Sequence, residues 1–176
     1  PGPKPSVPDN IFLCGLSGSG KSTVAPILAS LRGCEALDTD AMVASEAGLT
    51  IAEIFAREGE IGFRDREARA VAAACARQHA IVALGGGALE RDESFVRIGT
   101  HGLLVFLDAP DRVLTSRLRA DGNEIRPLLA RPNALSHLRA RRLVRFQTAA
   151  MTIDTSMLSP PEVAERINNV IPSVAR

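Results

Sequence analysis

Lys21 is one of only two lysines in a chain of 176 residues that also holds 19 arginines. It lies in the stretch GLSGSGKS, residues 15–22, which fits the pattern G-x-x-x-x-G-K-[ST] between an apolar run and a helical pattern. Glycines let such a backbone turn tightly and point its N–H groups into a concavity that binds anions. The sequence therefore predicts a phosphate-binding loop.

Each polar residue of this loop has an expected role. Lys21 reaches the outer phosphates of a nucleotide, and the hydroxyl of Ser22 is offered to Mg²⁺. The helix that follows adds partial positive charge at its N-terminus. The alternative is an ordinary glycine-rich turn, but the complete motif with both flanks favours nucleotide binding and phosphoryl transfer. The motif alone does not separate kinases from GTPases or motor ATPases, so it leaves the identity of the nucleotide open. We expect Mg²⁺ with the nucleotide, and we expect further contacts to the phosphates from Gly18, Ser19, Gly20 and Thr23.

Two carboxylates follow the second apolar run, in the stretch LDTDAM at 37–42. Asp38 is expected to hold Mg²⁺ through its water shell, beneath the phosphate loop. Asp40 is expected to face an acceptor hydroxyl, which it either orients or deprotonates. The alternative is a turn followed by a helix N-cap, a common position for aspartate.

Three further stretches could contact a ligand. The glycines of LGGGA at 84–88 would let a ligand approach backbone N–H groups, or they could simply adopt positive φ angles. Arg64 lies near the start of a long predicted helix, and RARRLVR at 139–145 forms a basic helix face. Taken alone, these arginines are typical of a solvated surface. The chain has no Trp or Tyr, which argues against a nucleic-acid stripe.

Short apolar runs alternate with helical patterns along the chain. The runs lack polar alternation, which is typical of strands buried on both faces of a parallel sheet. We expect strands at 11–15, 35–38, 80–86, 102–108 and 150–154. We expect helices at 20–32, 41–58, 60–78, 91–97, 110–119, 133–150 and 160–170. The class is therefore α/β, with ligands at the carboxyl ends of the strands.

Composition predicts one globular domain over 10–176, after a flexible Pro-rich tail or linker at 1–9. Hydrophobic residues make up 45% of the chain and the formal net charge is +1, so a general polyanion binder is not expected. Cysteines 14, 34 and 75 show no metal-ligand spacing and are expected to be buried in a cytoplasmic protein. No apolar run has the length of a membrane helix.

The order of these motifs resembles the shikimate kinase family, a branch of the P-loop NTPase fold. The resemblance covers about residues 10–171 and rests on GLSGSGKST at 15–23, LDTD at 37–40, FRDRE at 63–67, LGGGA at 84–88 and RADGNEIRPLL at 119–129. It implies a five-stranded parallel sheet of order 2-3-1-4-5 flanked by helices. It also implies a substrate-binding segment at about 40–68 and a mobile lid at about 120–133. The implied reaction transfers the γ-phosphoryl group of ATP to the 3-hydroxyl of shikimate.

The resemblance also implies roles for single residues. Asp40 matches the residue that holds the shikimate hydroxyls, and Gly86, between Gly85 and Gly87, matches a backbone donor at the ring. Arg64 and Arg141 match the two arginines that bind the shikimate carboxylate, although the choice of Arg141 over Arg142 depends on the register. The remaining matches lie on the nucleotide side and are Arg126 in the lid, with Arg119 and Pro160 beside the adenine.

Two departures from the family pattern stand out. The family usually has a tyrosine soon after its second carboxylate-binding arginine, and in this register Arg145 takes that position. The stretch 156–158 reads SML and lacks an arginine that the family often places near the adenine.

Two alternatives to a shikimate kinase remain at this stage. One is a related kinase of gluconate or nucleoside monophosphates, and the other is a non-catalytic sensing domain with the same fold. The resemblance implies a monomer that binds neither nucleic acid nor membrane, and the Pro-rich start allows fusion to another domain.

Overall fold

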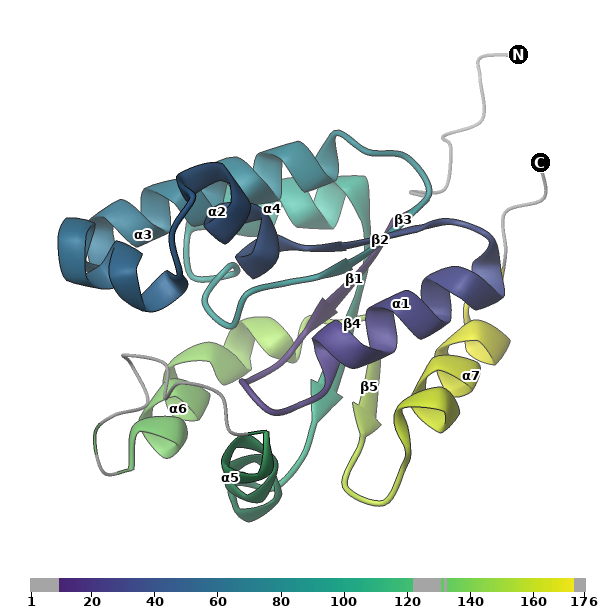
Figure 1. Ribbon diagram of the computed structural model, residues 1–176. Coiled ribbons are helices and arrows are strands. Elements are labelled where there is room, and N and C mark those ends of the chain that lie inside the picture. The colour runs from purple at the N-terminus through teal and green to yellow at the C-terminus, as the bar shows by residue number, and fades with distance from the viewer. Residues whose placement is uncertain (1–9, 122–130, 132, 173–176) are drawn as a thin grey trace, which may run out of the picture.

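The computed structural model describes residues 10–121, 131 and 133–172. Strands and helices alternate along most of the chain (Figure 1). The strands are β1 (Asn10–Cys14), β2 (Glu35–Asp38), β3 (Ala80–Ala83), β4 (Gly102–Asp108) and β5 (Met151–Asp154). The helices are α1 (Lys21–Arg32), α2 (Thr39–Ala47), α3 (Ile51–Cys75), α4 (Asp92–His101), α5 (Asp111–Ala120), α6 (Ala134–Phe146) and α7 (Pro160–Val170).

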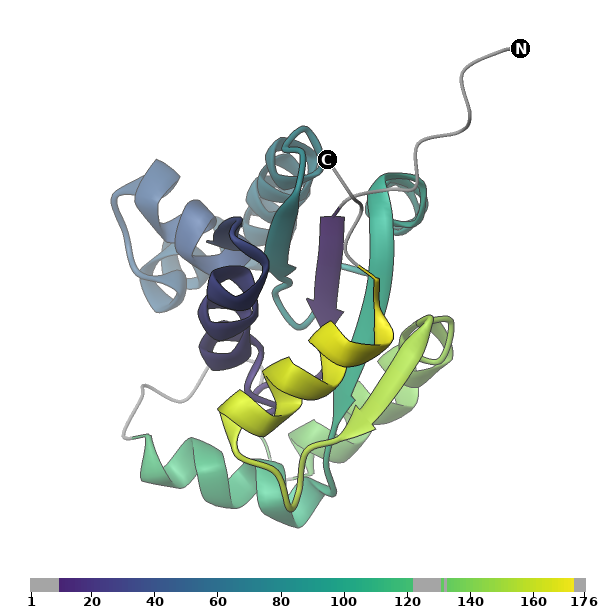
Figure 2. The ribbon, with the colours of Figure 1, turned by 90° about the vertical axis from the view of Figure 1, so that its right-hand side faces the viewer.

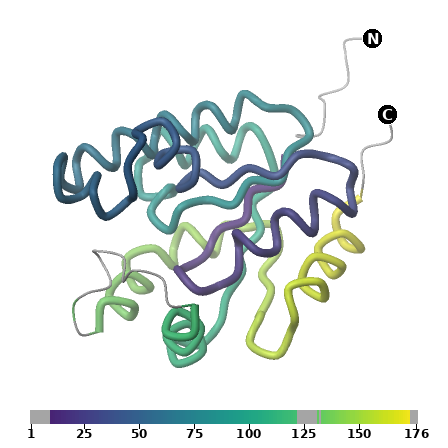
Figure 3. Tube along the Cα trace, viewed as in Figure 1, coloured from purple at the N-terminus to yellow at the C-terminus, as the bar shows by residue number. Residues whose placement is uncertain are grey.

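The five strands form one parallel sheet in the order β2-β3-β1-β4-β5, as expected. The central strand β1 places Ile11 opposite Ile81 of β3 and opposite Leu103 of β4. Every residue of β1 is buried, which explains why its sequence is apolar without alternation. Because all five strands run the same way, the loops that leave their carboxyl ends gather at one edge of the sheet (Figure 3).

Helices cover both faces of the sheet. On one face, α1 and α7 lie side by side, and Leu28 and Ile167 pack with Leu13 of β1 (Figure 2). On the other face, Val71 of α3, Ile98 of α4 and Phe146 of α6 pack with Phe12 of β1. Alternate residues of β1 thus enter different cores, which fixes the strand against a shift of register.

The predicted helix at 41–58 is two helices in the structure. Helix α2 ends at Ala47, and Gly48 takes a left-handed conformation with φ of 64°. Thr50 then begins α3 with a capping box formed with Glu53. Helix α3 continues through the predicted helix at 60–78 after a break at Gly59, where φ is 70° and ψ is −174°. A small satellite core beneath this pair contains Val43, Ile54, Phe63 and Ala70.

Two of the three cysteines have the expected burial, and the third does not. Cys14 and Cys75 are buried, and Cys34 is half-buried, with all three thiols free. Burial raises the pKa of Cys14 to about 12, so this thiol stays protonated and inert. None of the helices in the described part of the chain is long and apolar enough to cross a membrane.

Gly102 provides a test of the packing at the start of β4. A Cβ atom there would lie 2.6 Å from the ring of Phe12 and would also meet the carbonyl oxygen of Asn10. We expect Gly102→Ala to lower the free energy of unfolding by about 1–3 kcal/mol, because the clash involves backbone and a fully buried ring. Denaturant unfolding followed by circular dichroism measures this.

The matched control is Gly99→Ala in α4, where a Cβ atom would have no neighbour within 4 Å. Alanine favours the helix there, so we expect a gain of about 0.5–1 kcal/mol. Equal effects of the two substitutions would contradict this account.

Candidate active site

The phosphate-binding loop joins β1 to α1 and contains three glycines with positive φ angles. The φ angle of Gly18 is 85° and that of Gly20 is 93°, conformations that side chains rarely adopt. Lys21 begins α1, and its buried Nζ donates to the carbonyl oxygens of Gly15 at 2.8 Å and Leu16 at 3.0 Å. The loop thus curls around the ammonium group at a helix N-terminus, the arrangement that holds phosphate groups.

Asp38 lies directly beneath this loop. Its Oδ2 accepts a hydrogen bond of 2.5 Å from the hydroxyl of Ser22, and its Oδ1 accepts one of 3.1 Å from the backbone N–H of Ala41. Asp38 is therefore the N-cap of α2, as the alternative interpretation of this residue expected. The contact places a carboxylate and a hydroxyl oxygen side by side, and these are donors that suit Mg²⁺.

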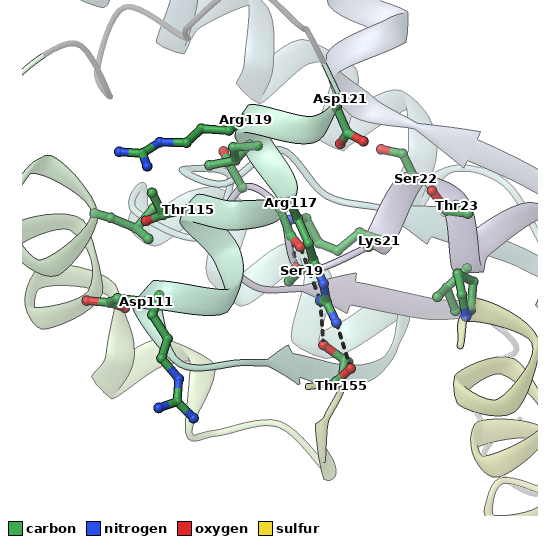
Figure 4. Close-up of a pocket in the computed structure, with 18 of the residues that line it drawn as sticks. Ser19, Lys21, Ser22, Thr23, Asp111, Thr115, Arg117, Arg119, Asp121 and Thr155 are labelled. Atoms are coloured by element: carbon green, nitrogen blue, oxygen red, sulfur yellow. Dashed lines mark hydrogen bonds between the residues drawn. The ribbon is translucent and has the colours of Figure 1, made fainter. Parts of the chain in front are cut away.

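A cavity of about 1190 Å³ opens over the phosphate-binding loop (Figure 4). It is lined by Gly18 to Thr23, by Asp38 at the end of β2 and Asp40 at the start of α2, and by two residues predicted to lie beside an adenine. The exposed Arg119 and the half-buried Pro160 are these two. The structure thus brings ten of the predicted residues to one cavity: Gly18, Ser19, Gly20, Lys21, Ser22, Thr23, Asp38, Asp40, Arg119 and Pro160.

The three glycines after β3 each lie against a different charged side chain. A Cβ atom at Gly85 would lie 2.5 Å from Oδ1 of Asp40, and one at Gly86 would lie 3.0 Å from Nη1 of Arg142. A Cβ atom at Gly87 would overlap the guanidinium group of Arg64. None of these three glycines has a positive φ angle. Close approach of charged groups, rather than backbone conformation, therefore requires glycine here.

Arg64 and Glu67 form the inner part of this second group. Nη1 of Arg64 donates to Oε2 of Glu67 at 2.6 Å, one turn along α3. Burial raises the pKa of Glu67, an effect that the charge of Arg64 opposes and that of Asp40 increases. In the described part of the chain, Oε1 of Glu67 is the one buried side-chain oxygen or nitrogen without a hydrogen-bond partner. Nη2 of Arg64 also donates to Oε1 of Glu60 at 3.4 Å, so both of these hydrogen bonds go to glutamates of its own helix.

Helix α6 supplies Arg142, and not Arg141, to this group. The side chain of Arg142 is 5% exposed, and its Nε donates to Oε1 of Glu90 at 2.5 Å. The side chain of Arg141 is 57% exposed and contacts the other oxygen of Glu90 from the solvent side. Adjacent helix positions point about 100° apart, so one of them faces the glycines and the other faces solvent. We call Asp40, Arg64, Glu67, Gly85, Gly86, Gly87, Glu90 and Arg142 the acceptor pocket.

Matching the second arginine of the family pattern to Arg142 instead of Arg141 also removes Arg145 from the position of the family's tyrosine. This residue hydrogen-bonds the carbonyl oxygen of Leu89 and the carboxylate of Asp92, and its guanidinium carbon lies 4.8 Å from the ring centroid of Phe95. Counted from Arg142, the position expected to hold a tyrosine falls on Phe146. The ring of Phe146 is buried and lies 5.0 Å from that of Phe106. When Arg142 replaces Arg141, the departure from the family pattern is therefore reduced to the loss of a phenolic hydroxyl group.

Arg117 of α5 connects the phosphate-binding loop with the segment after β5, a link that the sequence analysis did not predict. Its Nη1 donates to the carbonyl oxygen of Gly18 at 3.3 Å and to the hydroxyl of Thr155 at 2.9 Å. Its Nη2 donates to the carbonyl oxygen of Thr155 at 2.7 Å. Figure 4 shows this side chain reaching from the helix to Thr155, beside Lys21, while Arg119 extends away.

Comparison with known proteins agrees with this arrangement. Residues 17–172 match the family described as shikimate kinase. The chain belongs to the shikimate kinase family. A shikimate kinase from Symbiobacterium thermophilum is 43% identical over 162 residues, which cover 90% of this chain and 93% of that protein. One from Chlorobium chlorochromatii is 35% identical, with 96% of this chain and 90% of that protein covered.

Solved structures give the same result. A shikimate kinase from Acinetobacter baumannii, solved in complex with shikimate, superposes with a TM-score of 0.85 at 35% identity and covers 92% of this chain and 91% of that one. The shikimate kinase from Aquifex aeolicus has a TM-score of 0.78 at 29% identity, with 90% and 93% covered. Membership of the shikimate kinase family thus rests on sequence and on fold together.

Several residues of this shikimate kinase site were missed or lie outside the described residues. Glu67 is part of the quoted FRDRE motif, and its spacing of three from Arg64 was an available signal. Glu90 and Arg117 carry no signal in the sequence, because acids and arginines on loops and helices are mostly solvated. The predicted lid residue Arg126 lies outside the described residues, as does most of the predicted lid at 120–133.

The Arg117 link predicts a selective effect on the nucleotide. We expect Arg117→Met to raise the KM for ATP by about three- to tenfold, since one or two hydrogen bonds of about 0.5–1.5 kcal/mol position the loop and the segment after β5. The KM for shikimate should stay within twofold. Steady-state kinetics with each substrate varied in turn measures both.

The control is Arg166→Met, the same change at an exposed arginine of α7. It should leave both constants unchanged. An equal rise in the two KM values for Arg117→Met would show a general loss of structure instead of a nucleotide effect.

Proposed function

We propose that the two parts of this site work as one, with ATP in the large cavity and shikimate in the acceptor pocket. Asp40 is the observation that carries the proposal, because it lines the nucleotide cavity and also lies against Gly85 of the acceptor pocket. A hydroxyl held by Asp40 would therefore face the phosphates held by the loop. The reaction is transfer of the γ-phosphoryl group of ATP to the 3-hydroxyl of shikimate.

The chemistry of the acceptor pocket suits shikimate, a small carboxylic acid with three hydroxyl groups. Arg64 and Arg142 provide two guanidinium groups, whose planar forks match a carboxylate better than lysine does. Asp40 provides oxygens that accept hydrogen bonds from neighbouring hydroxyls. We assign the role of second carboxylate-binding residue to Arg142 in place of Arg141, because only Arg142 faces the glycines.

Phosphoryl transfer needs little covalent chemistry from the protein. The loose transition state carries charge on the phosphoryl oxygens, and catalysis consists mainly of positioning and neutralisation. Lys21 and the loop N–H groups neutralise the outer phosphates. Asp40 orients the accepting hydroxyl and is placed to receive its proton. Arg126 stays a proposed contact to the phosphates.

Ser22 and Asp38 fit the requirements of a Mg²⁺ site. Their oxygens are 2.5 Å apart beneath the loop, and this cation prefers oxygen ligands while keeping several waters. When bound, Mg²⁺ neutralises charge on the β- and γ-phosphates. Ser22 would bind the ion with its hydroxyl, and Asp38 would hold the ion through water.

An assay of ADP release with a panel of acceptors tests the proposed function. Shikimate should stimulate ADP release far more than gluconate or nucleoside monophosphates. A protein that binds ATP and shikimate without consuming ATP would support the non-catalytic alternative.

Lys21 gives the first prediction for the reaction. We expect Lys21→Met to lower kcat by at least about a thousandfold, because the ammonium group stabilises charge that develops in the transition state. The circular dichroism spectrum should remain that of the folded protein. Turnover close to that of the unchanged enzyme would contradict the assignment.

Arg142 and Arg141 form a matched pair on the same helix. We expect Arg142→Ala to raise the KM for shikimate by about 10- to 150-fold, the equivalent of a charge-assisted contact of about 1.5–3 kcal/mol. Arg141→Ala should change it by less than about threefold, since this exposed group forms only a solvent-screened ion pair. A larger effect at Arg141 would reverse the register assigned here.

A further inference from the structure

Glu90 lies between the two buried arginines of the acceptor pocket. Its Oε1 accepts the 2.5 Å hydrogen bond from Nε of Arg142 and lies 3.9 Å from Nη2 of Arg64. Its Oε2 contacts Arg141 on the solvent side. The carboxylate side chain is 16% exposed, so it is largely shielded from solvent.

The backbone of Glu90 is fixed by the loop that carries the glycines. Its N–H donates to the carbonyl oxygen of Gly87 at 2.9 Å, and the N–H of Ala88 donates to that of Gly85 at 3.0 Å. Arg145, one turn after Arg142 on α6, binds the carbonyl oxygen of Leu89. Arg145 and Arg142 of α6 thus bind the consecutive residues Leu89 and Glu90. These contacts restrict the position of Glu90.

Electrostatics explains why a carboxylate is needed here. Burial lowers the pKa of Arg142, and the positive charge of Arg64 lowers it further, while Glu90 acts in the opposite direction. Burial would raise the pKa of Glu90, but Arg142, Arg141 and Arg64 together hold it below its usual value. Glu90 is therefore ionised at neutral pH and offsets the repulsion between two guanidinium groups.

The contact also sets the orientation of Arg142. Glu90 binds the Nε side of the guanidinium group, whereas Nη1 lies at Gly86. An arginine held at Nε presents its Nη atoms in one direction, as a fork suited to a carboxylate. Glu67 differs in this respect, because it accepts its hydrogen bond from Nη1 of Arg64.

We propose that Glu90 is a positioning residue for the acceptor acid: it holds Arg142 by Nε and so aims the Nη atoms at the substrate carboxylate. This inference rests on the proposed function. It assigns to Glu90 a share in selecting a carboxylate-bearing acceptor, although Glu90 acts through Arg142 and does not contact the substrate.

Kinetics of Glu90→Ala and Glu90→Gln tests the proposal. We expect Glu90→Ala to raise the KM for shikimate by about 5- to 20-fold, with kcat and the KM for ATP within twofold of the unchanged enzyme. Glu90→Gln keeps an acceptor for Nε and should raise the KM less. If Glu90→Ala fails to fold, the KM of Glu90→Gln still tests the proposal. The control is Glu93→Ala, the same change at a side chain that is 76% exposed on α4.

A double-mutant cycle separates positioning from a general structural effect. In the Arg142→Ala background, Glu90→Ala should raise the KM for shikimate no further, because the group it positions is gone. A multiplicative effect of the two changes would overturn the proposal. An unchanged KM for shikimate in both Glu90 variants would also overturn the proposal. A lowered KM would overturn it too, because it would mean that Glu90 competes with the substrate for Arg142.

The unchanged enzyme separates this inference from the proposed function. If it phosphorylates shikimate and the Glu90 variants behave like it, the inference about Glu90 alone is wrong. If the unchanged enzyme does not phosphorylate shikimate, the proposed function is wrong and this inference falls with it.

Discussion

Two guanidinium groups of like charge lie inside one pocket, and much of the structure serves to keep them there. Arg64 comes from α3 and Arg142 from α6, two helices on the same face of the sheet. Burying either charge without a partner would cost several kcal/mol. Glu67 and Glu90 supply the partners, the first from the helix of Arg64 and the second from the loop after β3. Each of the two guanidinium groups is thus paired with a carboxylate.

This pairing explains how the sheet and the pocket depend on each other. The loop after β3 must bring Glu90 to α6 and must also pass close to Asp40 and Arg64. Gly85 is further fixed by a hydrogen bond of 2.8 Å from its N–H to the hydroxyl of the fully buried Thr39. The carboxyl ends of β2 and β3 are therefore joined by side chains as well as by strand pairing. The nucleotide loop after β1 lies next to them because β1 pairs with β3.

Local pattern predicted the strands, the phosphate loop and Asp38 and Asp40 as candidate site residues, and the resemblance to the shikimate kinase family supplied the strand order, which the structure confirms. The sequence analysis chose Arg141 over Arg142, because both are arginines on a basic helix and only packing against Gly86 separates them. It also extended the third strand to residue 86, whereas β3 ends at Ala83. The reason is that Gly85 to Gly87 leave the sheet to meet charged side chains. Such long-range partners are not visible in a local pattern.

The glycine loop has a consequence for changing the acceptor. Gly85, Gly86 and Gly87 have no side chains, so no smaller residue can replace them. Charged side chains occupy the space next to each of these glycines. A bulkier acid could not be accommodated by trimming this loop further. The extra volume would have to come from displacing α3 or α6, and each carries one of the arginines. A redesign that admits a larger acceptor would therefore weaken the binding of its carboxylate by Arg64 and Arg142.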